Sequence, residues 1–254
     1  MVHDMYEYMR IRETAFLVCL QWDQQPELSD NIRRVLIDWL HELMVEKEIE
    51  SETLHLTVSL IDRLLMMCSV SQRNVQLVGT AALMIASKYE QIYPPELDEF
   101  VYATDDSYSK SEILRMESKM LNYLRFDISV PTVEWFVSHL LNATKPSKTC
   151  FWLAHYLGDL SLLLTSLNGL PPSVIAAASL TLSNLITGHS PWTDEMEKMT
   201  GISLSQLEKP MAVLLGAFNA ASHSVQRSMF EKYCGSEYEE VAVLPSPSAL
   251  PSLH

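Results

Sequence analysis

The sequence predicts an all-α protein: two tandem five-helix units, an N-terminal helix and a short extended C-terminal tail. Its 254 residues include only 7 Gly and 12 Pro, and stretches rich in Leu, Ala, Met, Ser and Glu favour helices over sheets. Apolar residues also recur at helical spacing through most of the chain. Finally, the second half resembles the first when the chain is shifted by 96 residues. We expect residues 1–25 to form a helix and linker, 26–129 the first unit, 130–234 the second and 235–254 the tail.

The internal repeat rests on matched residues and on a shared order of helices. Identity between the halves is weak, but each half contains five helical segments, which indicates two copies of one unit. The aligned residues are Ala81-Ala82 with Ala177-Ala178, Ser87 with Ser183, Pro95 with Pro191, and Asp98-Glu99 with Asp194-Glu195.

The individual helices follow from apolar spacing and start signals. The first begins at an N-cap, Ser29 or Asp30, and carries one apolar stripe. The first unit is expected to have helices near 28–44, 51–67, 71–93, 95–102 and 109–124, and the second near 132–142, 149–166, 172–187, 193–199 and 204–221. The tail from about residue 235 is rich in Pro and Ser, a composition typical of extended segments.

Charge and cysteine usage narrow the function classes. A formal net charge of −14 makes phosphate-backbone binding a poor candidate, so no nucleic-acid partner is expected. Cys19, Cys68, Cys150 and Cys234 lie far apart without metal-ligand spacing, which indicates reduced thiols in an intracellular protein. The charged N-terminus does not resemble a signal peptide.

The segment from Ser161 to Thr193 has no formally charged residue, which raises the question of a membrane span. Asn168 and Gly169, followed by two prolines, interrupt it early, and the remaining 16-residue stretch 173–188 is short for a span. We therefore expect a helix buried on all sides and no membrane partner.

No catalytic motif is present in the sequence. "HELMV" (41–45) begins like a zinc-protease helix, but Val45 stands where the second His ligand is needed. The sequence has no glycine loop to cradle a phosphate and no nucleophile elbow. We expect no enzyme activity, no cofactor and no metal.

Two charges stand at positions with apolar helical neighbours. Lys88 has Met84, Ile85 and Ile92 three or four residues away, and Glu117 is placed in the same way among apolar residues. They could pair between two helices; alternatively, Lys88 caps a helix end and Glu117 lies at the surface. The repeat favours a pair with a special role. The matching positions of the second copy, 96 residues on, are Asn184 and Val213, so a pair needed only for the fold would be expected there too but is absent.

Several tracts closely resemble the cyclin box of A- and B-type cyclins. They are "ETLHLTVSLIDRLL", "VQLVGTAALMIASKYEQIYPPELDEFVYATDDSYSKSEILRMESKMLNYLRFDISVPT" and "IRRVLIDWL". "DMYEYMRIRE" resembles the helix before the first box, while "SVIAAASL" and "KYCGSEYEEVAVL" are similar to the second cyclin fold. The resemblance covers residues 4–244 and implies two five-helix cyclin boxes.

The resemblance implies a regulatory subunit that controls cell-cycle progression. Cyclins bind a cyclin-dependent kinase as a heterodimer and hold its C-helix in the active orientation, so the protein is expected in the nucleus and cytoplasm. The family's kinase-binding Lys–Glu pair falls on Lys88 and Glu117. By resemblance, the apolar contacts around it come from Tyr89, Leu121, Phe126 and Ile128.

A second site is implied by the helix that contains "IRRVLIDWL". In A-type and some other cyclins it forms a hydrophobic patch that docks Arg-x-Leu peptides of substrates or inhibitors. The matching positions here are Ile32, Val35, Leu36, Trp39, Glu42, Gln76 and Asp105. Leu36 and Trp39 could instead be plain core residues, and Trp39 is expected to be partly buried in either case.

The chain departs from the family pattern at several positions. Ile32 replaces Met, Arg34 replaces Ala, and Ala103 stands where a larger apolar residue is usual, which bears on peptide preference. "RRVL" (33–36) fits a minimal RxxL degradation signal, but we expect it in a buried helix. The chain begins at the helix before the first box, so either it is a shortened form or it is a divergent member, for example a viral one, without an N-terminal destruction box.

Two other function classes remain open. A cyclin-fold protein of the transcription machinery could bind DNA or an RNA polymerase kinase, but the acidic charge and the tracts quoted above disfavour it. An inert helical scaffold would leave Lys88 and Glu117 unexplained.

Overall fold

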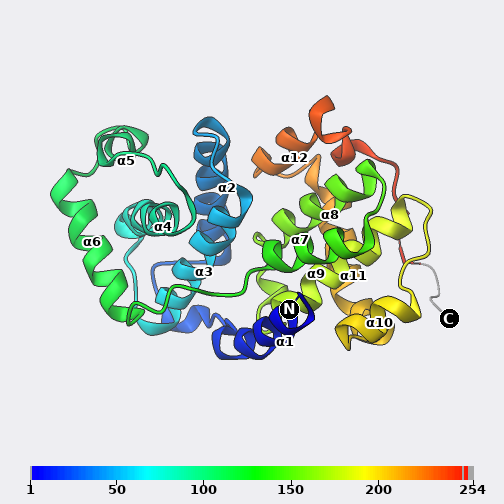
Figure 1. Cartoon of the computed structure of the whole chain (residues 1–254). Coiled ribbons are helices and arrows are strands. Elements are labelled where there is room, and N and C mark those ends of the chain that lie inside the picture. The colour runs from blue at the N-terminus through cyan, green and yellow to red at the C-terminus, as the bar shows by residue number, and fades with distance from the viewer. Residues whose placement is uncertain (1, 248, 251–254) are drawn as a thin grey trace. The chain divides into compact units, whose positions relative to one another are not determined.

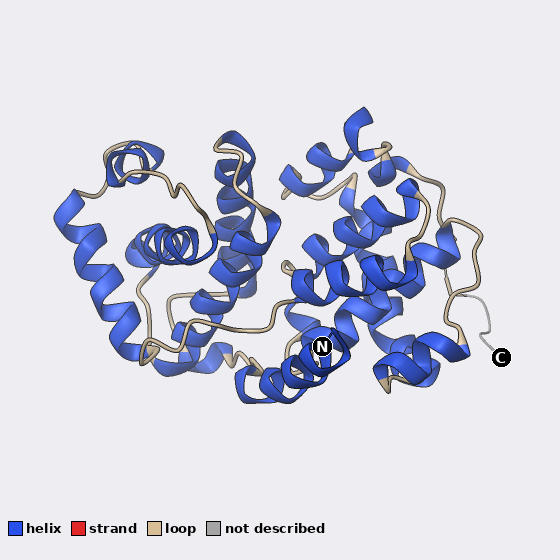
Figure 2. Cartoon of the chain, in the orientation of Figure 1, coloured by secondary structure: helices blue, strands red, loops and turns tan. Residues whose placement is uncertain are grey.

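The structure, a computed structural model, describes residues 2–247 and 249–250 and places them in two compact units. One unit is Ala15–Val130; the other combines the residues up to Thr14 with those from Pro131 onward. Every regular element in the described residues is helical (Figure 2). The first unit holds α2 (Asp30–Glu46), α3 (Ser51–Met67), α4 (Val75–Glu90), α5 (Leu97–Ala103) and α6 (Lys110–Tyr123). The second holds α1 (Val2–Glu13), α7 (Val133–Thr144), α8 (Lys148–Ser161), α9 (Pro172–Ile186), α10 (Asp194–Thr200), α11 (Leu204–Ala221) and α12 (Ser228–Tyr233).

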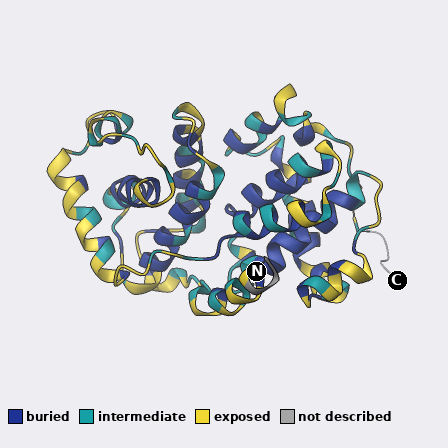
Figure 3. Ribbon diagram, viewed as in Figure 1, coloured by how far each residue is buried: buried dark blue, intermediate teal, exposed yellow. Residues whose placement is uncertain are grey.

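Helix α4 forms the centre of the first unit, where α2, α3, α5 and α6 pack around it (Figure 1). Its residues from Leu77 to Ser87 are all buried, as expected for a helix that is apolar on every side (Figure 3). Gly79 lets α2 approach closely, because a Cβ at this position would lie 2.8 Å from Leu36 Cδ1. The ten helices expected in the two repeats are all present, and Ser29 is the N-cap of α2, accepting from the Ile32 N–H.

The second unit repeats this arrangement around α9. Shifting α4 by 96 residues gives 171–186, which coincides with α9, and α7, α8 and α11 pack on α9 as α2, α3 and α6 pack on α4. The apolar stretch after the two prolines of the uncharged segment thus forms a buried core helix, α9. Among the described residues, no helix is long and apolar enough to cross a membrane.

Helix α1 belongs to the unit formed by the C-terminal half. Tyr6 packs edge-to-face on Phe136, with ring centroids 5.6 Å apart. At the other end of α1, the buried Glu13 carboxylate accepts from the Ser173 backbone N–H at 2.9 Å and from the Ser173 hydroxyl at 2.7 Å. These contacts join α1 to α7 and to the start of α9, a grouping that the sequence did not indicate.

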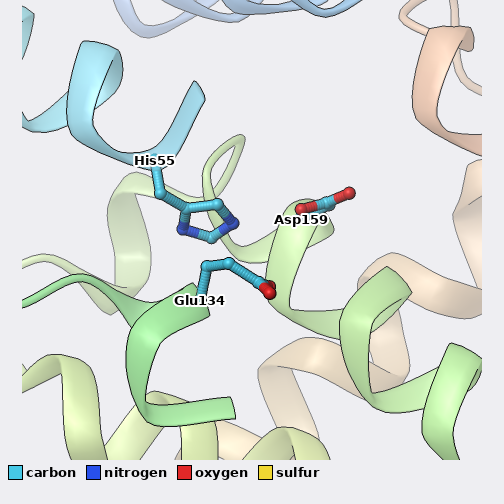
Figure 4. Close-up of side chains that lie close together, drawn as sticks. All are labelled: His55, Glu134 and Asp159. Atoms are coloured by element: carbon cyan, nitrogen blue, oxygen red, sulfur yellow. The ribbon is translucent and has the colours of Figure 1, made fainter. Parts of the chain in front are cut away.

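Helix α12 was not anticipated from the sequence and is held by a buried acid. The Tyr233 hydroxyl donates to Asp159 Oδ2 at 2.9 Å, and Lys232 Nζ lies 3.6 Å from the same oxygen. Asp159 is carried by α8 and Glu134 by α7, as Figure 4 shows, and Glu134 pairs with His155 at 2.9 Å. The contacts with Asp159 thus add to the burial of Met229 and Tyr233 in holding this short helix in place.

The C-terminal tail is less extended than its composition suggests. Two 3₁₀ turns, Ser236–Tyr238 and Val241–Val243, begin it, and Val241 and Ala242 are fully or nearly buried. The extended part starts at Leu244, whose φ is −61° and ψ 142°.

Candidate functional site

The two charges singled out from the sequence form an ion pair between α4 and α6. Lys88 Nζ lies 2.6 Å from Glu117 Oε1, and the two side chains are 48% and 16% exposed. Lys88 follows directly on the last buried residue of α4, so its helix carries it out of the core to the surface. An exposed pair of this kind contributes only about 0–1 kcal/mol to folding. Stability alone therefore gives little reason to place two charges here.

The pair has hydrogen-bonding capacity left for a partner. A lysine ammonium has three N–H donors and a carboxylate has two acceptor oxygens, and the contact between Lys88 and Glu117 uses one of each. The remaining groups can accept from a peptide N–H and donate to a peptide C=O. Such a site can bind the backbone of another chain at a helix end or turn, where these groups are unpaired.

Exposed apolar side chains lie on the same elements as the pair. Tyr89 follows Lys88 and is 47% exposed, while Leu114 and Leu121 stand one turn to either side of Glu117 on α6. Leu114 is 44% exposed, and Leu121 and Ile128 are half-buried. Apolar surface beside a charge pair suits a helix laid across it.

The end of α6 holds Phe126 in an exposed position. The Phe126 N–H bonds the Leu121 carbonyl at 2.9 Å and the Arg125 N–H bonds the Asn122 carbonyl at 3.1 Å, a Schellman pattern. Arg125 and Phe126 both have positive φ, 53° and 57°, which is costly for residues other than glycine. Phe126 is nevertheless 65% exposed, so the strained turn presents a large aromatic ring to solvent rather than burying it.

The second unit uses the matching positions internally. Asn184, 96 residues after Lys88, is 6% exposed; it accepts from the Cys150 thiol at 3.1 Å and donates to the Pro191 carbonyl at 3.3 Å. Val213 replaces Glu117 and is half-buried. The fold therefore does not require a charge pair at this place, since the second copy lacks one.

All seven residues of the expected docking patch line one of two neighbouring hollows in the first unit. The first hollow has a volume of about 300 Å³ and is mostly apolar. Its lining consists of Asn31, Ile32, Val35, Leu36, Trp39, Gln72, Val75 and Gln76. Val35 is 50% exposed and Trp39 half-buried, which leaves apolar surface open to a ligand side chain.

The second hollow, about 270 Å³, is acidic and shares Trp39 with the first. It is lined by Trp39, Glu42, Leu43, Glu46, Lys47, Tyr102, Ala103 and Asp105. Lys47 Nζ lies 3.4 Å from Glu46 and 3.6 Å from Glu99, so part of its charge is engaged. Three carboxylates against one lysine make this hollow attractive to a cation.

Helix α2, which carries most of both hollows, is anchored by a buried ion pair. Arg33 Nε and Nη2 donate to the two oxygens of Asp62 on α3, at 2.7 and 2.6 Å. This two-point contact fixes the helix, as bidentate pairs do. Within "RRVL", Arg33 and Leu36 are 4% and 5% exposed, but Arg34 is half-buried and Val35 is 50% exposed, so only half of the stretch is buried as expected. Arg34 lines neither hollow.

The sequence did not identify several residues of these surfaces. Glu46 and Tyr102 line the acidic hollow, and Val75 and Gln72 line the apolar one. Glu46 could have been found from the sequence, because it lies four residues after Glu42 and therefore on the same face of the same helix. Val75 and Tyr102 come from other helices, and no spacing rule connects them to α2.

Comparisons with known proteins agree with this double five-helix architecture. The family model of the cyclin N-terminal domain matches residues 4–129, and that of the cyclin C-terminal domain matches 131–247. Cyclin-A1 of Xenopus laevis is 38% identical over 252 residues, which are 98% of this chain and 60% of that protein. Cyclin-A2 of Homo sapiens is 40% identical over 252 residues, 97% of this chain and 58% of that protein. The chain thus spans about 60% of the length of the relatives it matches.

Solved structures share the fold at lower identity. A viral cyclin from herpesvirus saimiri superposes with a TM-score of 0.74 at 22% identity, covering 84% of this chain and 97% of that one. A chain of the yeast RNA polymerase II CTD kinase complex gives a TM-score of 0.65 at 14% identity, covering 87% and 85%.

The fold and the matched domains together define a tandem cyclin-box protein. The chain belongs to the cyclin family, and the relatives named above are A-type cyclins.

Proposed function

We propose that the protein is a regulatory subunit that binds a cyclin-dependent kinase and activates it by positioning the kinase C-helix. The observation that carries this proposal is the exposed Lys88–Glu117 pair, which has unused hydrogen-bonding groups and exposed apolar neighbours. The protein itself carries no catalytic step; it acts inside the cell, in nucleus and cytoplasm, during cell-cycle progression and mitosis.

The binding of the kinase follows from the chemistry of the Lys88–Glu117 pair. Lys88 and Glu117 bind backbone C=O and N–H groups next to the C-helix, while Tyr89, Leu121, Phe126 and Ile128 cover its apolar face. A kinase is active when its strand-three Lys pairs with a C-helix Glu, so a surface that fixes the C-helix controls catalysis. Regulation is therefore achieved through these hydrogen bonds and apolar contacts, without a cofactor.

Substrate recruitment is the second part of the proposal. The apolar hollow receives the Leu of an Arg-x-Leu motif and the acidic hollow receives its Arg, with Trp39 between them. Glu42, Glu46 and Asp105 supply charge for the guanidinium. Because Ala103 leaves room in the acidic hollow, a bulky basic side chain is accepted there.

Binding and activation of the kinase are tested by pull-downs with a panel of purified cyclin-dependent kinases, followed by a histone-phosphorylation assay. Lys88→Ala and Glu117→Ala should each weaken kinase binding by tenfold or more, about 1.5–3 kcal/mol, because each leaves partner groups unpaired. The free energy of unfolding in urea should change by less than about 1 kcal/mol, since the pair is exposed. Unchanged kinase binding and activation in both variants would contradict the proposal.

Two further variants distinguish specific hydrogen bonding to the kinase from the mere presence of an ion pair. Combining Lys88→Glu with Glu117→Lys keeps an ion pair but reverses the donor and acceptor offered to the partner, so activation should stay lost. Lys148→Ala breaks a comparable exposed pair with Glu239, 2.7 Å long, in the other unit and should leave binding unchanged.

A further inference from the structure

The C-terminal tail contains a Ser-Pro dipeptide that one side chain of α11 holds in place. The Ser246 hydroxyl donates a hydrogen bond to Asn219 Oδ1, and Asn219 Nδ2 donates to the Pro247 carbonyl at 3.2 Å. Asn219 lies on the exposed side of α11, Ser246 is half-buried and Pro247 is exposed. A single amide thus clamps both residues of the dipeptide at the surface.

The backbone around Ser246 is already extended. Pro245 and Pro247 fix their own φ angles, and each restricts the residue before it, Leu244 and Ser246, to extended geometry. A segment of this kind loses little conformational entropy when an extended-peptide groove binds it. Pro247 also lacks an N–H, so the groove must be one that needs no donor from the residue after the serine.

These features match the substrate of one enzyme class. We propose that Ser246 is a phosphorylation site for a proline-directed serine kinase and that phosphorylation undoes the Asn219 clamp on the tail. The proposal goes beyond the kinase-regulating role above and does not depend on it, because any proline-directed kinase can act on the site.

The modification is a phosphoryl transfer from ATP. The Ser246 Oγ forms a bond to the γ-phosphorus, and the bond from that phosphorus to the β–γ bridging oxygen breaks, its electron pair leaving with ADP. The hydroxyl proton passes to the general base of the kinase.

Loss of the clamp follows from donor counting. A phosphorylated Oγ has no hydrogen to donate to Asn219 Oδ1, and the phosphate brings about −1.5 to −2 charges and acceptor oxygens only. Asn219 can donate one of its two amide N–H groups to the phosphate, but the hydrogen bond from the Ser246 hydroxyl to Oδ1 is lost in any case. Both original bonds cannot persist, so the tail is held less firmly.

A second Ser-Pro dipeptide, Ser190-Pro191, provides an internal comparison. Ser190 is exposed, but Trp192 beside it is 8% exposed, with its indole N–H bonded to the Ile202 carbonyl at 2.9 Å. The Pro191 carbonyl accepts from the buried Asn184. An extended kinase groove could reach Ser190 only by pulling Trp192 from the core, so Ser246 is the favoured site.

The test treats the purified full chain with ATP and an active mitogen-activated protein kinase, a proline-directed enzyme that needs no cyclin. Intact mass should show phosphate incorporation, and fragment masses should place it on Ser246 rather than Ser248 or Ser190. Incorporation should vanish in Ser246→Ala, fall at least tenfold in Pro247→Ala and stay unchanged in the control Ser190→Ala.

The clamp has its own measurement. Asn219→Ala should raise the initial rate of Ser246 phosphorylation by roughly three- to tenfold, because the hydroxyl no longer has to leave a hydrogen bond. The Asn219 side-chain NH₂ signals in NMR spectra should shift on phosphorylation. Absence of incorporation, or incorporation elsewhere, overturns the site; an unchanged rate in Asn219→Ala overturns the clamp. None of these results bears on binding of a cyclin-dependent kinase.

Discussion

At the scale of single residues, the two units show how one fold position serves two purposes. Asn184 in the second unit satisfies buried groups, whereas Lys88 in the first projects to the surface and pairs with Glu117. The difference is one of burial: an amide inside the core must find its partners within the protein, while an exposed ammonium keeps donors for another chain.

Trp39 allows a prediction at this scale. Trp39→Ala removes the wall shared by the two hollows, so binding of an Arg-x-Leu peptide should weaken by about 2 kcal/mol or more, as for interface hot spots. Phosphorylation of Arg-x-Leu substrates by the assembled kinase should fall, while that of short peptides without the motif stays nearly constant.

Calorimetry with a labelled peptide and paired kinase assays measure the effect. Val45→Ala is the matched control, because Val45 is also on α2 and 47% exposed but lines neither hollow. Equal loss on both kinds of substrate would assign Trp39 a folding role instead.

At the scale of elements, helix termini were predictable where local chemistry sets them. Ser29 caps α2 through its side chain, and Ser109 and Glu112 form a capping box at the start of α6, both interactions within a few residues. Helix α12 has no comparable local signal. It depends on Asp159, 74 residues before Tyr233, and such a distant contact cannot be found from periodicity.

Helix α1 gives a prediction about its anchor, Tyr6. The ring is 3% exposed, its hydroxyl has no hydrogen-bond partner among the described residues, and burial raises the pKa of Tyr6 to about 12. Tyr6→Phe should therefore leave stability at pH 7 unchanged or raise it by up to about 1 kcal/mol, since an unsatisfied polar group disappears.

The pH dependence has a defined sign. The pKa of Tyr6 in the folded state is raised above the ordinary value of 10, so folding favours the neutral phenol. The contribution of the neutral phenol to the free energy of unfolding is therefore complete below pH 10. It is lost as the pH rises through about 12. Urea unfolding at pH 7, 9 and 11 should show an alkaline loss that is smaller in Tyr6→Phe. Tyr8→Phe, at a 58% exposed position of the same helix, should behave like the wild type. A large destabilisation of Tyr6→Phe at pH 7 would show that the hydroxyl is bonded.

At the scale of the whole molecule, each unit contains its own central helix and core. The Lys88–Glu117 pair and both hollows lie in Ala15–Val130, so this unit holds every surface of the proposed function. The other unit contributes α1, the buried polar cluster and the clamped tail.

A fragment of residues 15–130 should therefore fold on its own and bind an Arg-x-Leu peptide within about threefold of the full chain, a change below about 1 kcal/mol. Cooperative thermal unfolding and fluorescence anisotropy of the peptide check the two statements. The same fragment with Trp39→Ala is the control and should lose binding. A folded fragment that does not bind would place part of the docking site elsewhere.

The sequence by itself determined the helical class, the two-fold repeat, the ten repeat helices and the residue types at Lys88, Glu117 and Trp39. These depend on periodicity, capping and composition, all properties of neighbouring residues. Only the tertiary structure decided that Lys88 and Glu117 meet, that α2, η3 (Gln72–Asn74), α4 and α5 together line two hollows, and that α1 joins the unit from Pro131 onward. Those contacts join residues 29 to 160 positions apart, and packing rather than local preference selects them.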